Sequence, residues 1–209
     1  MSMVLARLQE KYPDAHCALR HRSAWELLVA TVLSAQCTDA RVNLVTPELF
    51  RRFPTPQATA TASLPELESL VRTTGFFRNK AKNILGAAQK VVNEFGGRVP
   101  STMEQLLTLP GVARKTANVV LGSWSGVASG VVVDTHVLRI SRRLGLTQAA
   151  TPEKVEQDLV RILPKDRWIG FSHQIIRLGR EICVARRPRC MECFLEDLCH
   201  AKDKTWGTM

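Results

Sequence analysis

The sequence predicts an all-α protein, and three observations support this. Glycines and prolines are spaced at the lengths of helices, alternating runs of β-branched residues are almost absent, and most segments place apolar residues at i, i+3 and i+4. The chain has 209 residues, of which 45% are hydrophobic, so it can bury a substantial core. Disorder over most of its length is therefore excluded.

Local signals place the first helices. The apolar spacing of Trp25-Leu28-Val29-Val32-Leu33 predicts a helix near the start of the chain. Ser101 and Glu104 have the spacing of a capping box directly after Pro100, which predicts a helix that runs through Leu107 and stops before Pro110. A tight turn then leads into a second helix, from about 114 to 120.

The sequence predicts helices in the C-terminal half as well. Three valines at 131–133 look extended, and Asp134 then stands at an N-cap position. A helix should follow as far as about Leu144, before Gly145. Two further helices, near 152–163 and 168–183, lead into a loop that is rich in cysteine.

The positive charge is concentrated in two segments. The chain has 29 Lys and Arg against 19 Asp and Glu, a formal charge of +10, and residues 72–98 and 109–144 together carry nine of those ten charges. The basic residues concerned are Arg72, Arg78, Lys80, Lys82, Lys90, Arg98, Arg114, Lys115, Arg139, Arg142 and Arg143. Such concentration favours an anionic partner, above all a phosphate backbone. The alternative is a pair of helices with solvated basic faces.

Composition also bears on the compartment. No stretch approaches the ~18 apolar residues of a membrane span, and the N-terminus lacks the basic start and long apolar run of a signal peptide. Six cysteines, four of them between 183 and 199, do not suit a secreted disulfide scaffold. We therefore expect a cytoplasmic protein, associated with the nucleoid, that has no membrane partner and is a monomer.

A turn at Leu109-Pro110-Gly111 joins two of the predicted helices. Backbone N–H groups at the start of the second helix would point outward there, which suits a phosphate oxygen and reads no base sequence. An ordinary helix connection is the alternative. The continuation Arg114-Lys115-Thr116, followed later by Val133-Asp134-Thr135-His136, favours a functional site.

These motifs resemble those of the helix-hairpin-helix DNA glycosylases, and among them the endonuclease III family. The resemblance covers almost the whole chain, because it includes residues 33–39, residues 75–81 and the terminal cysteine pattern. It implies a base excision repair enzyme that acts on double-stranded DNA. Such an enzyme removes oxidised pyrimidines and then incises the strand at the abasic sugar by β-elimination.

The chemistry needs an amine and a carboxylate. The amine attacks the sugar C1′ and holds the ring-opened sugar as a Schiff base, and the resemblance assigns this role to Lys115. Asp134 would stabilise the developing positive charge and assist proton movement. The alternatives are a solvated lysine and an aspartate that only caps a helix, although capping and catalysis can coexist in one residue.

The resemblance also implies residues around the reacting nucleotide. Gln36 would fill the gap left by the extruded nucleotide, Asp39 would lie near the pocket, where it can also cap a helix, and Thr116 and His136 would flank the catalytic pair. The positions expected on DNA are Gln36, Phe76, Leu109, Gly111, Ala113, Arg114, Arg186 and Arg187.

Two positions depart from the family pattern. Ala113 replaces the second glycine of the hairpin, and if this site needs a positive φ, the Cβ costs ~1 kcal/mol and weakens the phosphate contact. Phe76 stands where a leucine usually enters the duplex as a wedge, with Phe77 beside it. For two adjacent aromatics, a turn packed on the core is the alternative.

Four cysteines, Cys183, Cys190, Cys193 and Cys199, follow the spacing C-x6-C-x2-C-x5-C and indicate a metal centre. Tetrahedral zinc is the chemical alternative, but structural zinc sites commonly use two short paired knuckles and only one C-x2-C occurs here. The resemblance implies a four-iron, four-sulfur cluster (4Fe-4S) held by all four residues. Cys17 and Cys37 are expected to be small buried hydrophobes.

The resemblance further implies two lobes. Residues 17–127 would form a helical barrel domain with the hairpin and Lys115, and residues 1–16 with 128–209 would form the iron–sulfur cluster domain with Asp134. Two other functions stay open on the residues alone. One is a monofunctional mismatch or adenine glycosylase, which would differ at position 115, and the other is a catalytically weak or silent protein that binds DNA or senses damage.

Overall fold

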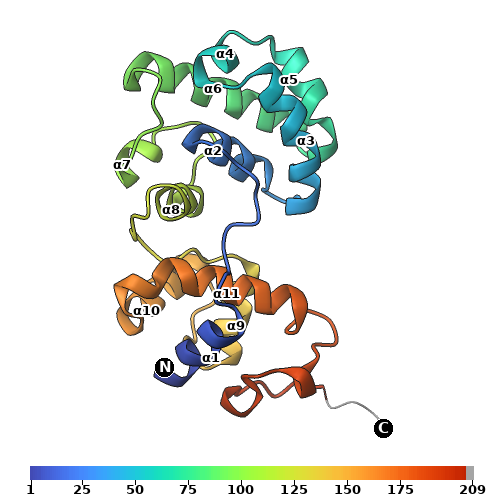
Figure 1. Ribbon diagram of the computed structural model, residues 1–209, viewed down its shortest axis with the longest axis vertical. Coiled ribbons are helices and arrows are strands. Elements are labelled where there is room, and N and C mark those ends of the chain that lie inside the picture. Colours follow the sequence, from blue (N-terminus) through green and yellow to red (C-terminus); the bar gives the residue numbers. More distant parts are fainter. Residues whose placement is uncertain (206–209) are drawn as a thin grey trace. The chain divides into compact units, whose positions relative to one another are not determined.

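The computed structural model describes residues 1–205, and these residues form helices and turns with no strand among them (Figure 1). The prediction of an all-α protein is thus confirmed. The chain divides into two compact units, Cys17–Val127 and a second unit made of Met1–His16 with the described part of Ala128–Met209.

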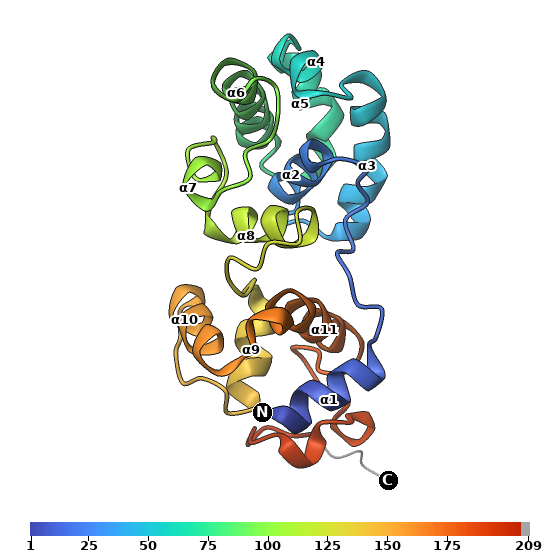
Figure 2. The same ribbon diagram turned by 60° about the vertical axis from the view of Figure 1, so that its left-hand side comes forward.

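The unit Cys17–Val127 is built around α2, which is buried on all sides. Nine of its ten residues are buried, as expected of a helix that is apolar on most of its faces. Helices α4 and α5 pack along α6, and α8 packs against α2 (Figures 1 and 2). The elements are α2 (Ala24–Leu33), α3 (Asp39–Arg52), α4 (Pro56–Ala60), α5 (Leu64–Val71), η1 (Arg72–Thr74), α6 (Phe77–Phe95), α7 (Met103–Leu106) and α8 (Arg114–Ser123).

The cap of α7 lies one residue later than the sequence suggested. Thr102, rather than Ser101, is the N-cap, and its side chain accepts a hydrogen bond from the Gln105 amide at 3.3 Å. The pair Thr102 and Gln105 has the same Thr-x-x-Gln spacing as a capping box, so two overlapping signals were present in the sequence. With Thr102 as the N-cap, Leu106 lies in the core.

The second unit has its core between α9 and α11. Leu8, Val137, Phe171 and Ile175 are fully buried there, and α11 packs against both α9 and α1. Figure 2 shows α1 beside the C-terminal loop of the same unit. The elements are α1 (Ser2–Lys11), α9 (Thr135–Arg143), α10 (Pro152–Ile162), η2 (Lys165–Arg167), α11 (Trp168–Glu181), η3 (Cys190–Glu192) and η4 (Glu196–Leu198).

The valines before α9 alternate in burial without pairing in a sheet. Val131 and Val133 are 1% and 6% exposed and join the core, whereas Val132 is half-buried. This alternation is that of an extended segment, and it brings Asp134 to the start of α9.

Among residues 1–205, no helix is both long and apolar enough to cross a membrane.

Candidate active site and cysteine centre

The hairpin between α7 and α8 is closed by a hydrogen bond from the Val112 amide to the Leu109 carbonyl, at 3.1 Å. Gly111 sits at φ +75, and a Cβ there would lie 2.8 Å from the Cβ of Asn83 on α6. Both facts require glycine at this position. The Asn83 contact could not be predicted from local sequence, since the two residues are 28 positions apart.

Leu109 anchors this hairpin and does not present a side chain for DNA. It is 2% exposed, its amide donates to the Leu106 carbonyl at 3.1 Å, and its own carbonyl accepts from Val112. The side chain of Leu109 therefore lies in the core and its main-chain groups are used inside the hairpin, and a contact between Leu109 and DNA stays a prediction.

Ala113 is not strained. Its φ is −94, in the extended region that any residue adopts, and it serves as the N-cap of α8. The condition for a strained backbone at Ala113, a positive φ, is therefore not met, because the turn takes its positive φ at Gly111. The first hydrogen bond of α8 runs from the Ala117 amide to the Ala113 carbonyl at 3.0 Å, so the helix does not use the amides before it.

Lys115 is exposed on the first turn of α8, and Arg114 beside it is exposed as well. Thr116 follows half-buried, and Ala117 is fully buried against the core. The helix thus fixes the backbone of Lys115 through its buried face while the amine remains open to solvent.

Asp134 caps α9 as its local sequence suggested. The amides of His136 and Val137 both donate to Oδ1, each at 2.8 Å, and Oδ2 receives neither bond. The carboxylate is half-buried. One oxygen is therefore held rigidly by the helix start, and the other can act on a further group.

His136 on α9 lies against Gly179 on α11. A Cβ on Gly179 would lie 2.5 Å from its Nδ1, so glycine is required for this crossing. Burial lowers the pKa of His136, Asp134 opposes this shift, and the positive charges of Arg139 and Arg180 add to it.

Gln36 and Phe76 share an unusual backbone conformation. Their φ angles are +53 and +48, in the left-handed region, and both side chains are exposed, Phe76 by 66%. Phe76 is therefore not part of a core-packing turn, and Phe77 beside it is half-buried, with Arg78 over its ring at 5.5 Å.

Asp39 does not cap its helix. Thr38 is the N-cap of α3 and accepts from the Arg41 amide at 3.2 Å, so Asp39 is the first helical residue and is half-buried. An acidic residue in the first turn suits the helix dipole.

Several of the clustered basic residues are used inside the fold. Lys80 is 4% exposed, and its ammonium bonds two backbone carbonyls. Arg139 bonds the Cys183 carbonyl, and Arg143 pairs with Asp203 at 2.7 Å. The count of basic residues thus overstated the surface available for phosphate.

The four clustered cysteines are free and half-buried, and three of them, Cys183, Cys193 and Cys199, pack against the core of their unit. Burial raises the pKa of the thiols of Cys183 and Cys193, and the other cysteines of the set raise it further. Four thiols close enough to influence one another, in partly dry surroundings, are a donor set suited to iron. Cys17 and Cys37 are half-buried rather than buried.

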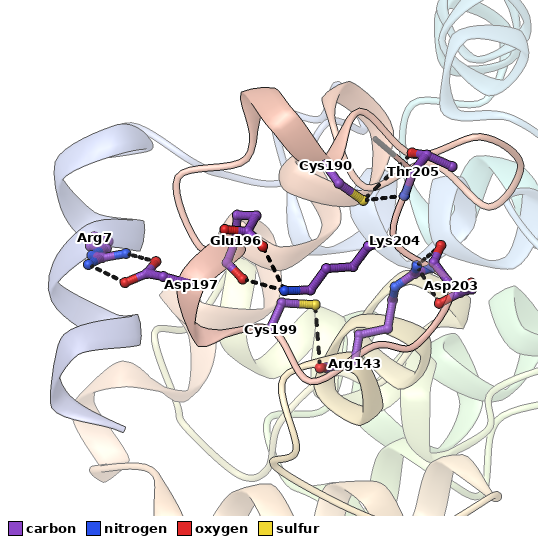
Figure 3. Close-up of polar contacts among 9 residues, drawn as sticks. All are labelled: Arg7, Arg143, Cys190, Glu196, Asp197, Cys199, Asp203, Lys204 and Thr205. Carbon is purple, nitrogen blue, oxygen red and sulfur yellow. Dashed lines mark hydrogen bonds and ion pairs between the residues drawn. The ribbon is translucent and has the colours of Figure 1, made fainter. Parts of the chain in front are cut away.

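Hydrogen bonds and ion pairs join the loop that carries these cysteines to residues before and after it in the chain (Figure 3). Arg7 of α1 pairs with Asp197 at 2.5 Å, and Lys204 pairs with Glu196 at 2.7 Å. The Cys199 sulfur lies 3.5 Å from the Arg143 carbonyl oxygen, and the Thr205 amide lies 3.4 Å from the Cys190 sulfur. Residues far apart in the sequence therefore support the cysteine loop.

Within residues 1–205, no three His, Cys, Asp or Glu side chains are grouped tightly enough to hold a single metal ion. A four-iron cluster takes one thiolate for each iron, so its ligands need not converge on one point. The half-buried thiols fit such a cluster.

Comparisons with known proteins identify the family of the chain. A model described as HhH-GPD superfamily base excision DNA repair protein matches residues 29–165, and the iron-sulfur binding domain of endonuclease III matches residues 183–199. Endonuclease III of Synechocystis sp. is 56% identical and that of Bacillus subtilis 43%, with 94% and 96% of this chain and 90% and 91% of those proteins covered. A solved structure of a trapped endonuclease III–DNA covalent intermediate has a TM-score of 0.91 at 44% identity, covering 95% of this chain and 93% of that one.

The fold, the hairpin and these matches define a base excision repair protein with a helix-hairpin-helix motif. Within this class the chain belongs to the endonuclease III family. It is therefore a DNA glycosylase that also has lyase activity at abasic sites, and its cofactor is a four-iron, four-sulfur cluster.

Proposed function

We propose that Lys115 and Asp134 carry out both reactions, on an oxidised pyrimidine nucleotide extruded from duplex DNA. The observation that carries this proposal is an exposed amine on the first turn of α8, directly after a hairpin whose amides suit phosphate. The half-buried Asp134 supports it, because only Oδ1 is engaged in capping.

The reaction begins when the unprotonated amine of Lys115 attacks C1′ of the sugar. The bond between C1′ and the base breaks, and the base leaves with its electron pair and takes up a proton. The sugar ring opens to give a Schiff base with the lysine nitrogen. Asp134 stabilises the positive charge that develops on the sugar, through the oxygen that does not cap α9.

The Schiff base then allows β-elimination. A proton leaves C2′, the bond between C3′ and its oxygen breaks, and the 3′ phosphate departs with that electron pair. Water hydrolyses the remaining Schiff base and frees Lys115. One lysine thus serves both base removal and strand incision, and neither step needs an external oxidant or reductant.

The DNA contacts are proposed on separate surfaces. Gly111, Ala113 and Arg114 would bind phosphate at the hairpin, where the α8 amides are not used by the helix. Gln36 and Phe76 would enter the duplex, since both side chains are exposed and both residues have a positive φ. Arg186 and Arg187 are exposed in the cysteine loop and would bind phosphate as well.

The remaining residues and domains are assigned in the same way. Asp39, Thr116 and His136 would lie around the reacting nucleotide. Residues 17–127 would serve as the helical barrel domain, and residues 1–16 with 128–209 as the iron–sulfur cluster domain. We also infer a monomer that acts at the nucleoid, where its substrate lies.

Borohydride trapping tests the catalytic assignment. The wild-type protein should form a covalent adduct with a duplex containing thymine glycol, and Lys115→Gln should form none while still binding the duplex. Lys82→Gln, which changes an exposed lysine on α6, is the matched control and should trap normally. Base release without incision by the wild-type protein would contradict the lyase mechanism, and binding without trapping would indicate a silent DNA-binding protein.

The second part of this proposal concerns the cluster. We propose that its ligands are the four cysteines Cys183, Cys190, Cys193 and Cys199. Cys193→Ala should lose iron and the visible absorption band near ~400 nm that thiolate-bound iron–sulfur centres show. Cys37→Ala changes a half-buried cysteine of the other unit and should keep both. Full iron content in Cys193→Ala would remove this residue from the ligand set.

A further inference from the structure

Lys80 is a buried cation that belongs to no ion pair of the described residues. It lies on the first turn of α6 and is 4% exposed. Its Nζ donates to the carbonyl oxygen of Leu33 at 2.8 Å and to that of Thr74 at 2.7 Å. Leu33 is the last residue of α2 and Thr74 the last of η1, so one ammonium joins two helix ends.

Helix ends are suitable partners for this ammonium. The last carbonyls of a helix have no partner within it and carry the negative end of its dipole. Burial lowers the pKa of Lys80, and the Cys37 sulfur opposes that shift. A well-packed apolar side chain would often serve a purely structural role as well as a buried cation does. The polar end of Lys80 therefore points to a specific arrangement of the two helix ends.

Both helix ends lead directly into the residues proposed to enter DNA. Gln36 follows Leu33 by three positions, and Phe76 follows Thr74 by two. Gln36 and Phe76 are two of the three non-glycine residues with positive φ in residues 1–205. Such conformations cost free energy and persist only where the surroundings enforce them. Lys80 binds the chain just before each of them.

We propose that Lys80 is a positioning residue for nucleotide extrusion, whose ammonium holds the loops of Gln36 and Phe76 in one arrangement so that both side chains enter the duplex together. This inference rests on the proposed function. Lys80 itself does not touch the DNA, because its ammonium is buried between two carbonyls.

Removing the ammonium should separate duplex opening from sugar chemistry. Lys80→Met keeps an unbranched side chain, one heavy atom shorter than that of lysine, and leaves both carbonyls without their donor. The loops then lose their common support, while Lys115 stays on α8. Extrusion from a duplex should weaken, and attack on a sugar that needs no extrusion should not.

The test uses the full-length protein with its cluster and two kinds of DNA. On a duplex with 2-aminopurine opposite a stable abasic analogue, saturating wild-type protein should change the fluorescence, and Lys80→Met should reduce that change at least fivefold. Excision of thymine glycol from duplex DNA should fall about tenfold or more in single turnover. Borohydride trapping on a single-stranded abasic oligonucleotide should stay within twofold of wild type.

Further variants show whether a loss of activity comes from the missing Lys80 ammonium or from another cause. Lys154→Met changes an exposed lysine on α10, outside the two basic segments, and should match the wild type in every assay. Phe76→Ala should reduce the fluorescence change, and adding Lys80→Met to it should reduce the change little further. If Lys80→Met does not fold, Lys80→Gln keeps donors for the carbonyls without the charge and should show the same split with a smaller loss.

Two results would overturn the inference. One is a normal fluorescence change and normal duplex excision in a folded Lys80→Met, and the other is an equal loss on single-stranded and duplex DNA in both Lys80 variants. Failure of the wild-type protein to trap any DNA would instead refute the proposed function.

Discussion

Arg139 donates a hydrogen bond from Nη2 to the carbonyl oxygen of Cys183, at 2.5 Å. The same nitrogen lies 3.3 Å from Nδ1 of His136. The helix that begins after Asp134 is thereby bonded to the residue that opens the cysteine loop. Formation of the cysteine centre and placement of the Asp134 carboxylate should therefore depend on each other.

Arg139→Met should weaken this connection. It removes the donor to Cys183 and leaves the carbonyl without that partner in a half-buried place, which costs about 1–3 kcal/mol. We expect a lower iron content per chain and a lower melting temperature. Arg142→Met, at an exposed position of the same helix, should change neither. Equal iron content in the two variants, measured by metal analysis, would show that the connection is dispensable.

Asp134 has two roles that substitutions can separate. Asp134→Asn keeps an oxygen that can cap α9 and removes the charge, so stability should change little while glycosylase activity is lost. Asp134→Ala removes the cap as well and should lower the free energy of unfolding by about 1 kcal/mol. Thermal unfolding and single-turnover excision measure the two effects. Normal excision by Asp134→Asn would leave capping as the only role.

Gly111→Ala should be more harmful than the same change at another glycine with positive φ. Gly126 has φ +66 and no atom within 4 Å of an added Cβ, so alanine there costs only about 1–2 kcal/mol of backbone strain. At Gly111 the new Cβ also meets Asn83, which adds about 1–3 kcal/mol. DNA affinity should fall only for Gly111→Ala. Equal melting temperatures for the two variants would contradict the close contact.

Ala113→Gly should not improve DNA binding. The backbone at Ala113 is already relaxed at φ −94, so glycine relieves no strain. The added freedom of the unfolded chain should lower the free energy of unfolding by about 0.4–1 kcal/mol. Equilibrium binding to an abasic duplex at fixed salt concentration checks the first point. A severalfold gain in affinity would mean that the methyl group itself obstructs phosphate.

Acid should destabilise the folded state through His173. Burial lowers the pKa of His173, and the positive charges of His16 and Arg180 lower it further. Because the unfolded state then binds a proton at higher pH than the folded state, the free energy of unfolding falls as pH drops from about 6.5 towards the folded pKa. His173→Gln should show a shallower fall in denaturant titrations between pH 7.5 and 5.5. Identical slopes would exclude this contribution.

Local signals in the sequence were sufficient for most helices and for the Asp134 cap. The spacing of Trp25 to Leu33 and the aspartate before α9 act within one or two turns of chain, where neighbouring residues dominate. The turn at Pro110 and Gly111 could be predicted for the same reason, and the spacing of the cysteines was also visible in the sequence. The pattern of residue types along the chain cannot show whether a polar side chain faces solvent.

Tertiary packing decided the points where the sequence misled. Lys80 was counted as surface charge and is buried, because its carbonyl partner at Leu33 is 47 positions away. The side chain of Leu109 is buried and anchors the hairpin, and the backbone at Ala113 is not strained because Gly111 has the positive φ.

The sequence by itself thus determined the helices, their main caps, the family motifs and the set of cysteine thiols. Only the tertiary structure decided which charges are buried, which glycine meets a neighbour and which distant residues brace each site. The physical reason is that helix formation and capping depend on residues a few positions apart, whereas burial and hydrogen-bond satisfaction depend on segments that meet only when the chain is folded.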